Sequence, residues 1–410
     1  MSGKRSLSTH TSLRAVVACI TIDKSASSSD SSRLGFNRQM ADLHLSYQET
    51  PRLRELLAEW DAHVAAEGPI VQHRWTNIAL WPAARSATVA GSTGIEGNPL
   101  TAGQVEEVLA GGTVDARQSD IREVLNYNRA LDLANRAALR PDFEWSQELL
   151  RRLNAVITAG LQDDERGEYR QQPVTVGGIF SPPEYQRLPA LMSQLVDWLG
   201  NDDDLHPLIR AGLTHLNVVS IHPWVNGNGR TARVAGSLML MRCGIGAPEL
   251  LNVESEIRAN RDRYMYVLQT THGATYRPEE HSATEWLEYF AAICVNRMGV
   301  RRRVAEAIPN DAGLLYMELE GTPRSDSWPL ILLTARLGPI RTARMAELLG
   351  LSPGRVRAML AEMAAQGWLQ AAGQRRGRVY RPGPRLLALP LRTPELMDRL
   401  WVEADELPEE

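Results

Sequence analysis

A run of twelve residues near the middle of the chain combines reactive side chains that few structural roles require. It reads HPWVNGNGRTAR and begins at His222. His222 can accept a proton near neutral pH and so activate a hydroxyl group. Arg230 and Arg233 lie three apart, so they share a face of a helix, and a forked guanidinium suits phosphate oxygens. The run therefore predicts a site that binds a polyphosphate and supports attack on it.

Glycines shape the turn inside this run. Gly227 and Gly229 flank Asn228, and all three residue types tolerate positive φ, so successive backbone N–H groups can converge on an anion. A helix is predicted from Thr231 onward, and the positive end of its dipole would face the same anion. Asn226 offers an amide oxygen to a hard cation such as Mg²⁺, which a carboxylate would bind more strongly.

The run resembles the signature of the Fic family, His-Pro-Phe-x-(Asp/Glu)-Gly-Asn-Gly-Arg-x-x-Arg, and seven of its nine specified positions are identical. Trp224 replaces the phenylalanine that anchors the loop in the core, and Asn226 replaces the acid that holds Mg²⁺ in the family. The resemblance implies a protein adenylyltransferase that uses ATP and Mg²⁺. His222 would be the base, and a Ser, Thr or Tyr hydroxyl of a target protein, or of the chain itself, would receive AMP. The nucleotide-binding residues that it implies are Gly227, Asn228, Gly229, Arg230, Thr231 and Arg233.

An upstream segment, STGIEGN from Ser92 to Asn98, resembles the inhibitory motif of the same family, (Ser/Thr)-x-x-x-Glu-(Gly/Asn). Ser92 and Glu96 are four apart and would share one face of a helix, and Gly97 favours a helix end. The resemblance implies that Glu96 pairs with Arg233 and blocks the position of the γ-phosphate. A solvated acid at a helix end is the alternative interpretation of Glu96.

The segment from Pro173 to Pro183 alternates β-branched and small residues around two glycines, and we expect a short β-hairpin there. The triplet that ends at Arg170, just before it, also resembles the family. By resemblance the hairpin is the flap that holds an extended target segment by strand addition, with an ordinary surface hairpin as the alternative. The candidate docking residues are Val174, Thr175, Val176 and Gly177.

Two further residues are candidates for the nucleotide pocket. Val219 precedes His222 by three residues, and core packing is its alternative role. Tyr264 lies in the segment NRDRYMYVL, which resembles the family's helix beside the adenine site. An aromatic ring there can stack on a base.

The C-terminal part of the chain is predicted to be a winged helix-turn-helix. Helices are expected over residues 342–349 and 353–366, followed by two strands around a basic turn. Nine arginines and two glutamates fall between residues 336 and 381, a local charge of +7 in a chain with a net charge of −4. Such asymmetry is typical of a DNA-binding surface, with protein docking as the alternative. The arginines expected on the second helix are Arg355 and Arg357.

Composition agrees with an intracellular globular protein. The 410 residues are 43% hydrophobic, and the three cysteines show no metal or disulfide spacing. No apolar run approaches the length of a membrane span, and we predict a cytoplasmic protein of mainly α fold. The expected parts are a disordered extension (1–39), a helical region with the inhibitory helix (40–120), a catalytic core (121–315), the winged helix (326–390) and an acidic tail (391–410).

Two other functions stay open at this point. Glu96 could orient a water molecule so that the same site removes AMP from modified proteins. Alternatively, the chain is a DNA-binding regulator whose Fic core only senses nucleotide. The predicted partners are ATP, an unidentified target protein and DNA, with no membrane and with a homodimer left open.

Overall fold

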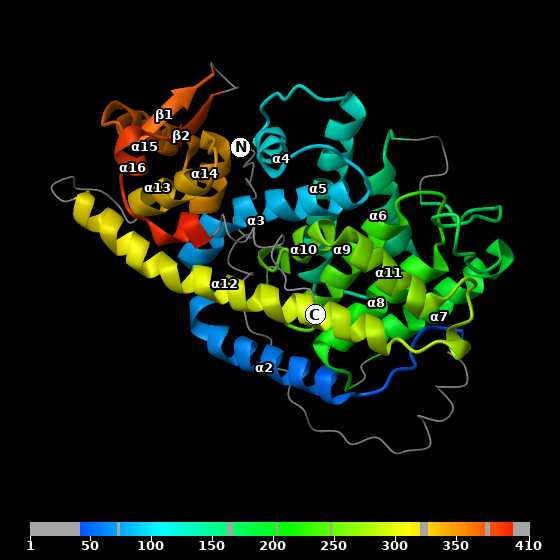
Figure 1. Ribbon diagram of the computed structural model, residues 1–410. Helices are drawn as coiled ribbons and strands as arrows, with labels where there is room; N and C mark the ends of the chain where they lie inside the picture. The colour runs from blue at the N-terminus through cyan, green and yellow to red at the C-terminus, as the bar shows by residue number, and fades with distance from the viewer. Residues whose placement is uncertain are drawn as a thin grey trace, which may run out of the picture.

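The fold is mainly α, as predicted, with one two-stranded antiparallel sheet in the part of the chain that the structure describes (Figure 1). None of the helices in this part is long and apolar enough to cross a membrane. The predicted disordered extension and most of the acidic tail lie outside the described residues. This computed structural model describes residues 42–71, 74–161, 167–201, 204–246, 248–319, 327–373 and 378–396.

The helices of the N-terminal half bury apolar side chains in the larger core. Leu53 and Trp60 are buried in the first of them, and Val124, Tyr127 and Leu131 are buried in α5. These helices are α2 (Pro51–Val71), α3 (Arg74–Ile95), α4 (Ala102–Leu109), α5 (Gln118–Ala138), α6 (Gln147–Thr158) and α7 (Leu188–Gly200).

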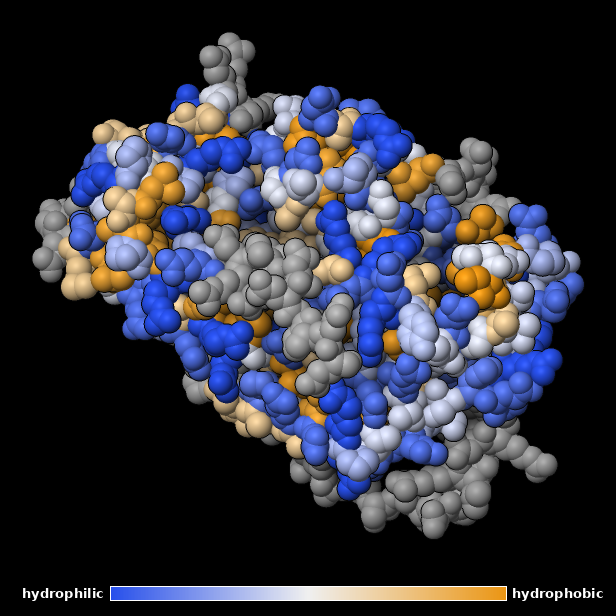
Figure 2. All heavy atoms as spheres, viewed as in Figure 1, coloured by the Kyte–Doolittle hydropathy of each residue, from blue (hydrophilic) through white to orange (hydrophobic). Residues whose placement is uncertain are grey.

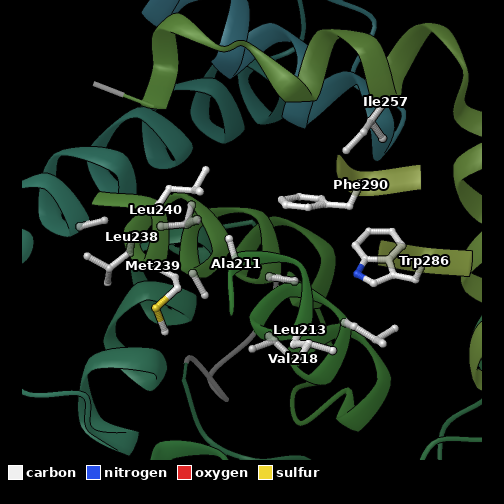
Figure 3. Packing of buried hydrophobic residues seen from close by; sticks show 14 of the residues in the cluster. Ala211, Leu213, Val218, Leu238, Met239, Leu240, Ile257, Trp286 and Phe290 are labelled. Atoms are coloured by element: carbon white, nitrogen blue, oxygen red, sulfur yellow. The ribbon is translucent and has the colours of Figure 1, made fainter. Parts of the chain in front are cut away.

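The central pair, α8 (Pro207–Ile221) and α9 (Asn228–Arg242), brackets the HPWVNGNGRTAR run and packs together. Figure 3 shows Leu213 of α8 and Leu238 of α9 in one apolar cluster with Trp286. The two helices that flank the loop are therefore held together by a close-packed core. The later elements are α10 (Val253–Ala259), α11 (Arg261–His272), α12 (Thr284–Glu318) and the 3₁₀ turns η2 (Tyr185–Arg187), η3 (Pro248–Leu250) and η4 (Pro278–Glu280).

The end of α3 is a closed C-terminal cap that fixes the position of Glu96. The backbone N–H of Gly97 donates to the carbonyl of Gly94 at 3.0 Å, and that of Asn98 donates to Thr93 at 3.1 Å. Gly97 adopts a φ of +96°, which an L side chain rarely takes. This pair of bonds around a left-handed glycine is the Schellman arrangement, so Glu96 is held at the capping position.

The C-terminal module, residues 327–390, contains both predicted helices, α14 and α15, with bounds that agree to within one residue. β1 and β2 pair antiparallel, with Leu369 opposite Pro382, and Ile340 forms an isolated antiparallel bridge with Tyr380. Sequence analysis did not identify the first helix of the module. The elements are α13 (Ser327–Leu337), α14 (Thr342–Leu349), α15 (Pro353–Ala365), β1 (Leu369–Ala372), β2 (Val379–Pro382) and α16 (Pro384–Leu387).

The described residues form two hydrophobic cores that share two helices. The larger core lies among α2 to α12, and the smaller one joins the C-terminal module to α3 and α12. Around both cores the face seen in Figure 2 is largely hydrophilic, with hydrophobic surface in separate areas. The residues that α3 and α12 contribute to the smaller core include Ala79, Leu80, Ala83, Ala84, Val300, Val304 and Ile308.

Candidate active site

His222 terminates α8 and is held there as a neutral base. Its backbone is left-handed, with φ of 50°, and its N–H donates to Val218 at 3.2 Å. The ring Nδ1 lies 3.2 Å from the carbonyl oxygen of Val219, which can only accept, so Nδ1 carries the proton and Nε2 has the free lone pair. Burial lowers the pKa of His222 to about 4, so the ring is uncharged at neutral pH. Val219 thus serves the site through its carbonyl group.

The loop after His222 is closed by the side chain of Asn228. Its Oδ1 accepts from the N–H of Trp224 at 3.0 Å, and its Nδ2 donates to the carbonyl of Trp224 at 2.8 Å. The buried indole of Trp224 donates to the carbonyl of Gly167 at 3.1 Å, so this residue anchors the loop as expected. Asn228 is itself buried, so only its backbone can serve a ligand in this conformation.

Arg170, a residue to which sequence analysis gave no role, ties this loop to the segment predicted as the flap. The buried guanidinium donates to the carbonyls of His222 at 2.9 Å, Gln172 at 3.0 Å and Pro183 at 2.5 Å. Its backbone N–H donates to Pro223 at 2.9 Å. One side chain therefore fixes both ends of the flap segment against the catalytic loop.

The expected β-hairpin is reduced to a single bridge. Val176 pairs with Phe180 across a tight turn in which Gly177 and Gly178 have φ of 59° and 72°. Two successive positive φ values suit a tight hairpin turn, but among the described residues no further pair joins the Val176–Phe180 bridge to make a strand. The turn stands out from the surface, since the side chain of Ile179 at its tip is 54% exposed.

The first turn of α9 differs from the prediction, because the helix begins at Asn228 and not at Thr231. Gly227 precedes it with φ of 77°, and the first helical bond runs from the N–H of Thr231 to Gly227 at 2.9 Å. The N–H groups of Asn228, Gly229 and Arg230 therefore lie at the open end of the helix, where an anion is favoured. The hydroxyl of Thr231 is buried and donates to Gly227 at 2.8 Å.

Asn226 is engaged by its own loop. Its Oδ1 accepts from the N–H of Gly227 at 2.7 Å and from the guanidinium of Arg230 at 3.1 Å. Arg230 in turn forms an ion pair with Glu123 of α5, a carboxylate that sequence analysis missed. The other oxygen of Glu123 accepts from Asn98 at 2.8 Å, just after the cap of α3. Glu123 thereby links the inhibitory turn to the first signature arginine.

These contacts do not fit a resident Mg²⁺ site. The one oxygen expected to bind the cation already accepts two hydrogen bonds, and Asn226 carries no charge. Across the described residues, no group of three or more His, Cys, Asp or Glu side chains is arranged to hold a metal ion. Mg²⁺ is usually bound by one or two carboxylates together with substrate phosphates. The chain itself supplies too few ligands in this conformation.

Arg233 and Glu96 form the central contact of the site. The guanidinium of Arg233 is buried and donates to Glu96 Oε1 at 2.7 Å, to Ser92 Oγ at 2.7 Å and to the Ser92 carbonyl at 3.0 Å. Burial would raise the pKa of Glu96, but the charges of Arg233 and Arg230 bring it below its usual value. The pairing of Glu96 with Arg233 that the resemblance implied is therefore present, and Ser92 contacts the same guanidinium.

Glu96 lies at the open end of α9. A methyl group added at Gly229 would come within 2.5 Å of Glu96 Oε1. The carboxylate thus occupies the place where the N–H groups of the first turn and the guanidinium of Arg233 would otherwise receive an anion. Its side chain remains 33% exposed, against 2% for that of Arg233, so the carboxylate is the movable partner.

The structure does not bring Tyr264 to an open pocket, and its predicted stacking on a base finds no support here. The ring is buried, and the hydroxyl lies 3.0 Å from Nε2 of His215. Trp286 packs edge-on against the same ring, with 6.1 Å between ring centroids. In this structure Tyr264 is a core residue in contact with His215 and Trp286.

Comparison with known proteins agrees with this geometry. Residues 144–240 match the model of the Fic/DOC family. The chain is 32% identical over 229 residues to the protein adenylyltransferase Fic of Drosophila willistoni, which covers 54% of this chain and 44% of that protein. The corresponding protein of Drosophila melanogaster is 31% identical over 259 residues, covering 62% and 49%. The chain therefore spans about half the length of the curated relatives it matches.

A solved structure is similar in fold. The crystal structure of a Fic family protein from Desulfovibrio desulfuricans superimposes with a TM-score of 0.54 at 23% sequence identity. The alignment covers 83% of this chain and 98% of that one.

Proposed function

We propose that the chain is a member of the Fic family and a protein adenylyltransferase that transfers AMP from ATP to a hydroxyl group of a protein. One observation carries the proposal. The short loop between α8 and α9 joins a neutral histidine, His222, to an anion-binding position at the first turn of α9. The carboxylate of Glu96 already occupies this position. The place that Glu96 takes suits the γ-phosphate of a nucleotide.

The reaction follows from these groups. Nε2 of His222 takes the proton from a Ser, Thr or Tyr hydroxyl, and the oxygen attacks the α-phosphorus in line. The bond from the α-phosphorus to the bridging oxygen breaks, pyrophosphate leaves, and AMP stays on the hydroxyl. Arg233, Arg230 and the N–H groups of the first turn of α9 would hold the phosphates, so that positioning and charge neutralisation supply most of the rate.

Mg²⁺ would enter with the phosphates of ATP. Bound there, it would neutralise phosphate charge. Asn226 would be the residue that contacts the cation. Its amide oxygen would first have to lose the hydrogen bond that it accepts from Arg230.

The flap supports the choice of a protein as acceptor. Arg170 fixes its base beside His222, while Gly177 and Ile179 are exposed at the glycine turn. An extended segment that added to Val174 and Thr175 would bring its hydroxyl toward the catalytic histidine. We expect the natural target to present a mobile loop.

Autoinhibition is the second part of the proposal. With Glu96 on Arg233, the γ-phosphate meets a carboxylate in place of a guanidinium, and ATP binds in a pose that does not react. The cap around Gly97 and the bond from Asn98 to Glu123 keep the carboxylate in place.

A second function, binding of DNA, is favoured by one feature of the C-terminal module. On α15 the side chains of Arg355 and Arg357 are exposed, while Val356 between them is buried against the module. The helix thus presents a basic face to solvent at the place where a winged helix carries its recognition helix. The tip of the predicted wing, with Arg375 and Arg376, lies outside the described residues.

We expect His222→Ala to lower the rate of AMP transfer by about 10²- to 10⁴-fold, the usual contribution of a general base. His63→Ala on α2 is the matched control. Because the pKa of His222 is lowered to about 4, the neutral base prevails above that value. The rate should stay level from pH 8 to about pH 5 and fall as the pH approaches 4, as long as circular dichroism shows the folded state. A decline centred near pH 6.5 would contradict this assignment.

We expect Glu96→Gly to raise transfer by about 10- to 100-fold, the shift allowed by loss of one charge-assisted hydrogen bond of ~1.5–3 kcal/mol. Incorporation of α-labelled ATP into the chain and into a lysate gives the rate, with the exposed Glu144→Gly as control. If transfer stays unchanged and removal of AMP from a modified protein is lost, Glu96 serves the hydrolytic removal of AMP.

Asn226→Asp should lower the Mg²⁺ concentration for half-maximal transfer by at least about threefold, because hard cations favour charged oxygens. The measurement is a Mg²⁺ titration at saturating ATP, with Asn201→Asp at the end of α7 as control. An identical midpoint for variant and wild type would show that the phosphates alone hold the cation.

If the C-terminal module binds DNA, affinity should fall steeply with salt, because each phosphate contact releases counterions. Alanine at Arg375, Arg376 and Arg378 should weaken binding to all sequences and flatten the slope of log K against log salt by about 2 to 3. Changes at Arg355 or Arg357 should instead relax sequence preference. Gel shifts with the full chain decide this, and no retardation at low salt would favour protein docking.

A further inference from the structure

The turn that carries Glu96 lies between two helices, and both contact the C-terminal module. α3 ends at Ile95 and α4 begins at Ala102, so only a short turn separates them. In Figure 1 the two helices are neighbours at the side of the molecule where α13 and α14 lie. Because the cap around Gly97 is rigid, displacement of either helix must move Glu96 relative to Arg233.

The contact with α3 is apolar and close. Four small or aliphatic side chains of its N-terminal half join the buried cluster of the module, where α13 packs across them. Three of the four are alanines, which let the helix backbones approach. At the edge of this interface the guanidinium carbon of Arg344 lies 4.6 Å from the ring centroid of Trp81, a cation–π contact. The four residues are Ala79, Leu80, Ala83 and Ala84.

The contact with α4 is polar. Arg381 of β2 pairs with Glu107 of α4 at 2.5 Å, and their side chains are 48% and 22% exposed. Beside them, Glu106 lies so close to Gly338 that a Cβ atom there would overlap its carboxylate. Burial raises the pKa of Glu106 to about 7, so this interface carries less negative charge than its sequence suggests. One ion pair therefore holds the exposed side of the α4 interface.

Between its contact with the module and the turn, α3 is also tied to the larger core. Arg85, in the middle of α3, is buried and donates to Glu249 and to Asp132, both at 2.7 Å. Gly91 lies against the backbone of Glu254, where a Cβ atom would be 2.7 Å away. The turn that carries Glu96 is thus held in two ways. The larger core holds it through Arg85 and Gly91, and the C-terminal module holds it through Trp81 and Glu107.

We propose that the C-terminal module controls the degree of autoinhibition, because its contacts with α3 and α4 keep Glu96 paired with Arg233. The proposal rests on the adenylyltransferase function proposed above. It assigns Arg381 and Arg344 a regulatory role at a distance from the reacting atoms. Weakening the contacts of the module with α3 and α4 should favour the state in which Glu96 has left Arg233 and a phosphate can bind there.

A charge-swap experiment in the full chain tests the proposal. Arg381→Glu places two carboxylates together and should raise AMP transfer by about three- to tenfold, in line with the modest worth of a partly exposed ion pair. Arg381→Glu combined with Glu107→Arg should return the rate to within about twofold of wild type. Arg54→Glu, a charge reversal at an exposed position of α2, is the matched control. In a Glu96→Gly background, Arg381→Glu should add nothing.

Amide hydrogen exchange at Gly97 and Asn98 gives a readout that does not depend on catalysis, since both N–H groups are bonded within the cap. Arg381→Glu should speed exchange there, and the charge swap should restore protection. Unchanged rate and exchange in both Arg381→Glu and Arg344→Ala would overturn the proposal, as would an equal rise in rate with and without Glu96. If Glu96→Gly transfers no AMP at all, the adenylyltransferase proposal fails, and the exchange data alone still decide whether the module holds the turn.

Discussion

A buried guanidinium at the end of a helix is the constraint on which the rest of the structure depends. Arg233 is almost completely enclosed, yet it keeps its charge, so it must always have an anionic or carbonyl partner. Ser92 supplies part of this partnership permanently, and Glu96 supplies the rest through a carboxylate that is still partly exposed. In the proposed function a nucleotide phosphate takes the place of Glu96, so Arg233 keeps a partner in both states.

The catalytic loop shows how little freedom such a site leaves its surroundings. Trp224 and Asn228 close the loop on itself, Arg170 joins it to the flap, and the carbonyl of Val219 selects the tautomer of His222. Each of these contacts uses a backbone group of the loop. These contacts hold the backbone of the loop in place. In the proposed reaction, Glu96, Arg230 and the flap are then the parts that have to move when ATP and the target protein bind.

Sequence patterns predicted the parts of this site that are local and missed those that are not. The HPWVNGNGRTAR run and the STGIEGN segment are compact, so residue types and spacing indicated His222 and Arg233, and the family resemblance added Glu96. The helices α14 and α15 were also predictable, because Ser352-Pro353 and Gly350 are strong local signals. Glu123 lies in an ordinary amphipathic helix, and nothing local shows that it meets Arg230 across more than a hundred residues. The burial of Tyr264 was not predictable for a related reason, since the sequence cannot show which face of α11 is covered by Trp286.

The sharing of α3 between two cores limits how this chain could have been assembled from parts. A helix that completes the C-terminal module with one half and ends in the inhibitory turn with the other cannot be exchanged for a foreign segment without rebuilding both partners. A gene fragment that stopped after α12 would leave the alanine face of α3 open to water and its regulatory turn supported from one side only. Substitutions can therefore alter the exposed faces of such a chain more readily than they can separate the C-terminal module from the turn that carries Glu96.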